Sequence, residues 1–178
     1  MNQPNTIPNI LIAGVGNELR QDDAFGLLLA RSFTQSNDFP PNVKVYEFGI
    51  GGIHLVQELH NHYDILVILD AVSWGGKPGE ICFRSASTND INELSKDEKR
   101  NFLADMHYAT PVRALMLAKA VNVLPDEVYI LGCEAHHTEE FEMGISPEVE
   151  RAIPIAISVL TQWLRTRIGK LEHQEISD

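Results

Sequence analysis

The sequence predicts an α/β fold, a three-layer α/β/α sandwich around a mostly parallel twisted sheet of about five strands. Two observations support this prediction. Residues 10–16 and 65–71 are nearly continuous apolar runs, which is typical of strands buried on both faces. Segments with apolar residues at helical spacing follow such runs repeatedly, and this alternation is typical of parallel sheets with right-handed crossovers. One edge strand of the sheet could be antiparallel.

Each element has its own signal along the chain. We expect strands over residues 10–16, 43–48, 65–71, 80–84 and 128–133, and helices over 23–33, 51–59, 111–121 and 146–167. The run at 65–71 is the most apolar, so it is expected at the centre of the sheet. The short run at 80–84 follows a glycine-rich turn and alternates in polarity, so it is the candidate antiparallel edge. Residues 85–105 are polar and are expected to form a loop and a short helix.

Composition limits the protein class. The chain has 178 residues, which fits one domain over 1–178 with frayed ends at 1–9 and 170–178. The formal charge of −11 offers no basic surface for phosphates, so nucleic acid is excluded as a partner. No apolar run is long enough to cross a bilayer, and no signal peptide precedes the first strand. We therefore expect a cytoplasmic protein without membrane contact, and we expect a monomer.

Three polar side chains are candidates for a functional site. Asp23 follows the first strand, Asp70 ends the central strand, and His107 lies in the loop before a helix. Functional residues of open parallel sheets gather beyond the carboxyl ends of the strands, so these three are expected to converge there. Two carboxylates and one imidazole, with coordination positions left open, suit a divalent transition metal.

Structural roles compete with this interpretation for each residue. Asp22 or Asp23 could cap the helix that follows, which stabilises a helix by ~0.5–2 kcal/mol. Asp70 could accept hydrogen bonds from the next turn. A single loop histidine such as His107 is more often a surface residue than a ligand. The common position at one sheet edge is what favours a site.

A nucleotide-binding interpretation is weaker. The stretch Gly14-Val15-Gly16-Asn17-Glu18-Leu19 is similar to a dinucleotide-binding loop, and Glu47 stands where the ribose-binding acid would be expected. However, the fingerprint requires glycine where Leu19 stands. The carboxylates of Asp22 and Asp23 would also repel a pyrophosphate. No nucleotide cofactor is expected.

The same residues carry a resemblance to a known family. Residues 14–26, GVGNELRQDDAFG, resemble the signature of the hydrogenase maturation proteases, in which Asp23 matches the first metal-binding acid. Asp70, in Leu69-Asp70-Ala71, matches the second. His107 stands at the family's distance before an Ala-Leu-x-Leu-Ala stretch at 114–118, and residues 143–149, MGISPEV, resemble the segment that opens the last helix. Ile50 replaces a threonine common in the family, and the loop at His136-His137 lacks the usual proline.

The resemblance implies an endopeptidase that removes the C-terminal extension of a nickel-iron hydrogenase large-subunit precursor after nickel insertion. Its partner would be the nickel-loaded precursor, and the nickel would be supplied by that substrate. Asp23, Asp70 and His107 would be both the catalytic and the metal-binding residues, with Asp22 as a further candidate base. Two alternatives stay open: a peptidase or amidase of the same fold with another substrate, and a non-catalytic module that checks for nickel.

Overall fold

The computed structural model describes residues 7–36, 39–88, 111–139 and 141–172 and shows a five-stranded sheet. The strand order is β2-β1-β3-β5-β4. All neighbours are parallel except β4, which pairs antiparallel with β5 at the edge of the sheet. The strands are β1 (Ile10–Val15), β2 (Val43–Gly49), β3 (Ile65–Val72), β4 (Ile81–Ser85) and β5 (Glu127–Glu134). The predicted fold class, the central strand and the antiparallel edge are confirmed.

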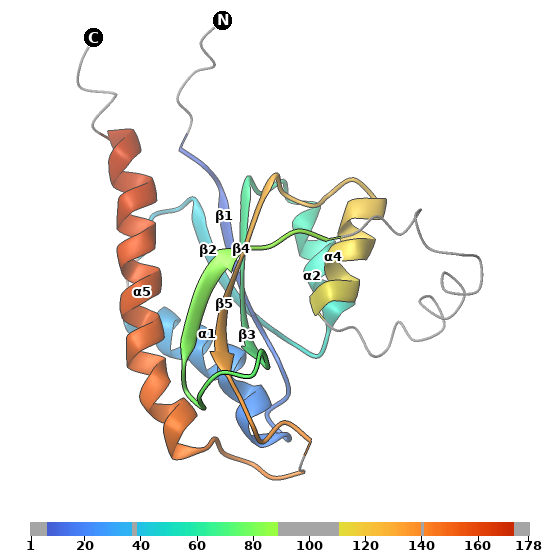
Figure 1. The fold of residues 1–178 in the computed structure, drawn as a ribbon. Helices are drawn as coiled ribbons and strands as arrows, with labels where there is room; N and C mark the ends of the chain where they lie inside the picture. The colour runs from blue at the N-terminus through green and yellow to red at the C-terminus, as the bar shows by residue number, and fades with distance from the viewer. Residues whose placement is uncertain (1–6, 37–38, 89–110, 140, 173–178) are drawn as a thin grey trace, which may run out of the picture.

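Helices cover both faces of this sheet (Figure 1). The described helices are α1 (Phe25–Ser36), α2 (Gly52–Leu59), α4 (Pro111–Ala120) and α5 (Pro147–Glu172), with a 3-10 helix, η1 (Gln21–Ala24), before α1. Alternate residues of β3 point to opposite faces. Val67 and Leu69 pack in a cluster with residues of α1 and α5, whereas Leu66 and Ile68 pack in a second cluster with residues of α2 and α4. The predicted three layers are therefore present.

Two helix boundaries differ from the prediction. The helix expected from Asp23 begins instead as η1, and regular α-helix starts only at Phe25. The last helix was expected to end near Arg167, with fraying from residue 170, but it continues to Glu172. Gly169 weakens a helix by roughly 1 kcal/mol, yet Lys170, Leu171 and Glu172 are good helix formers, so one glycine does not end it. None of the described helices is long and apolar enough to cross a membrane.

Gly26 lets the first helix sit directly on the strands. A Cβ atom at this position would lie 2.1 Å from the Leu69 carbonyl oxygen and 2.3 Å from that of Val15. Both neighbours are backbone atoms of β3 and β1, so neither can move aside without shifting a strand. The start of α1 is therefore pressed against the carboxyl ends of the two strands. This contact holds η1, and Asp23 with it, at the carboxyl end of the parallel strands, where Asp70 lies.

Candidate active site

Asp23 lies in η1, just beyond the carboxyl end of β1, and its side chain is half-buried. Its backbone is fixed by the turn around it: Asp23 N–H donates to the Arg20 carbonyl at 2.9 Å, and Asn17 N–H donates to the Asp23 carbonyl at 3.2 Å. Burial raises the pKa of the Asp23 carboxyl group and the negative charge of Glu139 adds to this, while the Arg20 guanidinium and the Asn17 N–H oppose it. The carboxylate is thus held at the strand edge in a partly desolvated position.

Asp70 is the sixth residue of β3 and lies opposite Gly132 of β5. Strand alternation places its side chain on the α2 and α4 face, in line with Leu66 and Ile68. Burial and the negative charge of Asp23 raise the pKa of Asp70 to about 8, although a hydrogen bond from Ala71 N–H lowers it. The structure thus brings the two predicted carboxylates close enough to repel each other electrostatically.

The third predicted residue, His107, lies outside the described residues, as does Thr110, the expected cap of the following helix. That helix, α4, begins at Pro111 and packs on the same face of the sheet toward which Asp70 points. Within the described ranges, no group of three or more His, Cys, Asp or Glu side chains could hold a metal ion. The described part of the site is therefore a carboxylate pair, and its third member is still a prediction.

Asp22 has a structural role that the sequence did not reveal. Its carboxylate is fully buried and accepts hydrogen bonds from Ser146 N–H at 2.7 Å and His137 N–H at 3.3 Å. No side-chain hydrogen bond caps η1. Asp22 therefore does not serve as the helix cap that the sequence allowed, because its carboxylate turns instead toward the loop before α5. Since both of its oxygens are occupied by these N–H groups, Asp22 is poorly placed to act as a base.

Glu134, at the carboxyl end of β5, fixes a second loop near the carboxylate pair. Its side chain is buried at the end of β5 and accepts hydrogen bonds from Trp74 N–H at 2.8 Å and from the Ser73 hydroxyl at 3.4 Å. The backbone N–H group of Trp74, helped by those of Gly76 and Gly75, holds the pKa of Glu134 below its ordinary value against the opposing effect of burial. Glu134 therefore fixes the loop that leaves β3 just after Asp70. The sequence offered one signal for it, a carboxylate ending a buried strand, as Asp70 does on β3.

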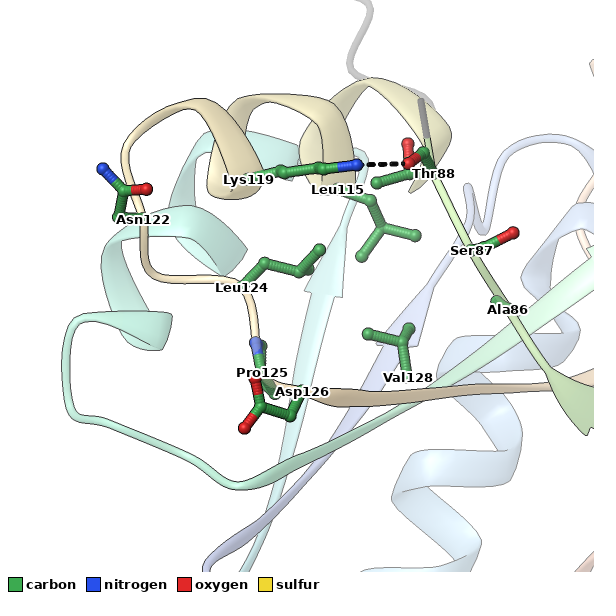
Figure 2. A pocket seen from close by; sticks show the side chains of 10 residues that line it. All are labelled: Ala86, Ser87, Thr88, Leu115, Lys119, Asn122, Leu124, Pro125, Asp126 and Val128. Atoms are coloured by element: carbon green, nitrogen blue, oxygen red, sulfur yellow. Dashed lines mark hydrogen bonds between the residues drawn. The ribbon is translucent and has the colours of Figure 1, made fainter. Parts of the chain in front are cut away.

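A cavity of about 470 Å³ is a separate feature of the molecule (Figure 2). Leu115 and Lys119 of α4 and Val128 at the start of β5 line it. Lys119 closes one side by donating to the Thr88 carbonyl at 2.9 Å. Val128 lies near the amino end of β5, whereas Asp23 and Asp70 lie near the carboxyl ends of their strands. The cavity is therefore at the other end of the sheet from the two carboxylates.

Asp23 and Asp70 lie near the carboxyl ends of two neighbouring parallel strands, which is where open α/β sheets usually carry their functional sites. The hydrogenase maturation protease family model, described as HycI, matches residues 27–163. The chain is 26% identical over 163 residues to the hydrogenase expression/formation protein HupD of Rhizobium leguminosarum bv. viciae, covering 92% of this chain and 77% of HupD. It is 29% identical over 157 residues to the coenzyme F420 hydrogenase subunit delta of Methanothermobacter thermautotrophicus, covering 85% and 91%.

Solved structures agree with these sequence matches. The hydrogenase maturating endopeptidase HybD of Escherichia coli superposes with a TM-score of 0.69 at 25% identity, covering 89% of this chain and 93% of HybD. The HycI protease of Thermococcus kodakarensis, at 21% identity and a TM-score of 0.64, shares the fold. The chain belongs to the hydrogenase maturation protease family, and it is accordingly an endopeptidase.

Proposed function

We propose that this endopeptidase removes the C-terminal extension of a nickel-iron hydrogenase large-subunit precursor after nickel insertion. We further propose that it recognises the substrate-bound nickel through Asp23, Asp70 and His107. The observation that carries the proposal is the coupling of Asp23 and Asp70, two carboxylates from different elements that repel each other at the loop-lined edge. A cation placed between such carboxylates relieves their repulsion, so the pair favours a positively charged partner.

The donor types suit nickel on a substrate. Carboxylate oxygens and an imidazole nitrogen are accepted by divalent transition metals, and three ligands leave positions open for groups of the precursor. His107 precedes α4, and α4 covers the face toward which Asp70 points. That His107 binds beside Asp70 is part of the proposal. The high pKa of Asp70 leaves its carboxyl group mostly protonated near neutral pH, and metal binding would displace that proton.

Hydrolysis of the scissile peptide needs a polarised carbonyl and an activated water. The substrate-bound nickel, positioned by these ligands, could orient and polarise the peptide, a contribution worth several kcal/mol of barrier lowering in metal sites generally. A carboxylate with a raised pKa suits the removal of a proton from the attacking water. The water oxygen then bonds to the carbonyl carbon, the C–N bond breaks, and the released amine takes up a proton. Asp23 is the stronger candidate for this base in our proposal, because Asp22 is engaged by Ser146 and His137.

The test is the intact mass of a nickel-loaded precursor before and after incubation with purified protein. We expect a loss equal to the mass of the C-terminal extension. Asp23→Asn, Asp70→Asn and His107→Ala should each abolish that loss while remaining folded. Asp126→Asn is the matched control, since Asp126 is an exposed carboxylate at the opposite edge, and it should process normally. Normal cleavage by Asp70→Asn would contradict the proposed site.

A further inference from the structure

Exposed apolar side chains gather around the carboxylate pair. Leu19, Ile50, Trp74, Phe141 and Met143 are all exposed, and they lie on the loops that follow β1, β2, β3 and β5. These loops lie at the same edge of the sheet, the lower edge in Figure 1, because the four strands are parallel. We call these five residues the apolar rim. Other exposed apolar side chains include Val112 of α4, Val121 just after α4 and Ile155 of α5, and these lie on separate elements.

The rim is held in place by hydrogen bonds between its loops. Gly16 N–H donates to the Gly49 carbonyl at 3.2 Å, which joins the loop of Leu19 to that of Ile50. Gln21 N–H donates to the Glu142 carbonyl at 2.9 Å, and the Arg20 guanidinium lies 5.4 Å from the centre of the Phe141 ring. The loops after β1, β2 and β5 therefore support one another.

Trp74 is fixed from a different direction. Its N–H donates to the buried Glu134 carboxylate at 2.8 Å, so the loop after β3 is tied to the end of β5. Its ring nevertheless remains partly exposed, beside the strand end that carries Asp70. The loops that carry the rim residues are held by hydrogen bonds, so their apolar side chains stay in contact with water, which is unfavourable. Such patches on a protein surface mark interaction sites, and aromatic residues and methionine are enriched in them.

The charge of the rim limits what can bind there. Glu139 and Glu142 flank Phe141, and the Glu139 side chain is 89% exposed. A second copy of this chain, with net charge −11, would place acidic rim against acidic rim. The partner that fits is a polypeptide with apolar side chains and neighbouring basic ones.

We propose that the apolar rim docks the precursor polypeptide beside the cleavage site and supplies affinity that does not depend on nickel. This inference rests on the proposed function, since it takes the precursor as substrate. A macromolecular substrate must be held on more than its scissile bond, and the rim surrounds the place where that bond would lie. Phe141 and Met143 are the most exposed members, at 80% and 76%, so replacing them removes apolar docking surface at the smallest loss of packing within the fold.

The experiment measures binding of nickel-free precursor to the full-length protein. The double variant Phe141→Ser/Met143→Ser should bind at least tenfold more weakly than wild type. Ile155→Ser, which alters an exposed apolar residue on α5, should bind as wild type does. Raising the salt concentration should weaken wild-type binding if basic side chains face Glu139 and Glu142. On nickel-loaded precursor, the double variant should raise KM with little change in kcat, because it leaves Asp23 and Asp70 intact.

Unchanged affinity in the double variant would overturn the inference, as would failure of wild type to bind nickel-free precursor. A wild-type dimer that the double variant converts to monomer would also overturn it, by assigning the rim to self-association. The proposed function fails separately, if wild type leaves the nickel-loaded precursor uncleaved. In that case a weakened complex in the double variant would still support the docking surface.

Discussion

The negative charge of Asp23 raises the pKa of Asp70, although Asp23 lies in η1 and Asp70 in β3. The two meet because Gly26 allows the first helix to rest against the backbone of both β1 and β3. Each carboxylate is also partly removed from water. The outcome is a pair whose charges are unfavourable together until a proton or a cation is shared between them.

Asp70→Asn should change the pH dependence of stability in the metal-free protein. The folded pKa of about 8 lies above the ordinary 3.8, so the contribution of Asp70 to stability is fully present below pH ~4 and is lost as the pH rises toward 8. Asparagine does not titrate. The stability of the variant relative to wild type should therefore increase between pH 4 and pH 8, as measured by urea unfolding with a chelator present. A difference that stays constant with pH would contradict the raised pKa of Asp70.

Asp22→Asn should be less stable than wild type, whereas Asp23→Asn should be as stable as wild type. The asparagine side chain keeps one acceptor for Ser146 N–H or His137 N–H and turns an NH₂ group toward the other, which leaves a buried donor unsatisfied. Such a loss costs about 1–3 kcal/mol. For a protein of this size, Tm should fall by about 2–4 °C for each kcal/mol. Calorimetry compares the two variants directly. Equal Tm values would show that the hydrogen bonds of Asp22 do not stabilise the fold.

Gly26→Ala should destabilise the protein and disturb the site. Alanine is the better helix former by about 1 kcal/mol, so intrinsic propensity alone would stabilise the variant. The added Cβ meets the carbonyl oxygens of Leu69 and Val15, and overpacking of this kind costs roughly 1–3 kcal/mol. Gln35→Ala, at an exposed position of the same helix, is the control. Urea unfolding should show a lower free energy of unfolding for Gly26→Ala only, and a more stable Gly26→Ala protein would refute the close contact.

Glu134→Gln should give the opposite pH trend to Asp70→Asn. The folded pKa of Glu134 lies below 4.5, so its contribution to stability is present above pH ~4.5 and disappears as the pH falls through the folded pKa. The variant should be less stable than wild type at neutral pH, and the gap should narrow in acid. The backbone N–H of Trp74 donates to this carboxylate, so the Trp74 contribution to tryptophan fluorescence should change when the loop is released. A gap that is independent of pH would argue against an ionised Glu134.

Much of the fold could be predicted because its signals are local. The apolar run at 65–71 indicates a strand buried on both faces, and its single acid, Asp70, stands near the carboxyl end of that strand. Parallel pairing then brings that end beside the loop after β1. Position in the sheet was enough to predict the meeting of Asp23 and Asp70.

The sequence could not show which of the two adjacent acids, Asp22 or Asp23, has a structural role and which belongs to the candidate site. Asp22 and Asp23 are adjacent and chemically identical, and which one faces β3 depends on the hydrogen bond to His137, 115 residues along the chain. The backbone of Gln21 also takes a positive φ of 41°, which no pattern indicated. Glu134 escaped notice for the same reason, since its partner Trp74 is 60 residues away. A contact between single side chains far apart in the chain produces no repeating sequence pattern from which it could be predicted.

The most direct test of nickel recognition compares two forms of one precursor, nickel-loaded and nickel-free, incubated with the same purified protein. Intact mass spectrometry follows the loss of the C-terminal extension. If Asp23, Asp70 and His107 read the substrate-bound metal, only the nickel-loaded form should lose mass, and adding nickel to the free enzyme alone should not make the nickel-free precursor cleavable. Equal cleavage of both forms would contradict the account.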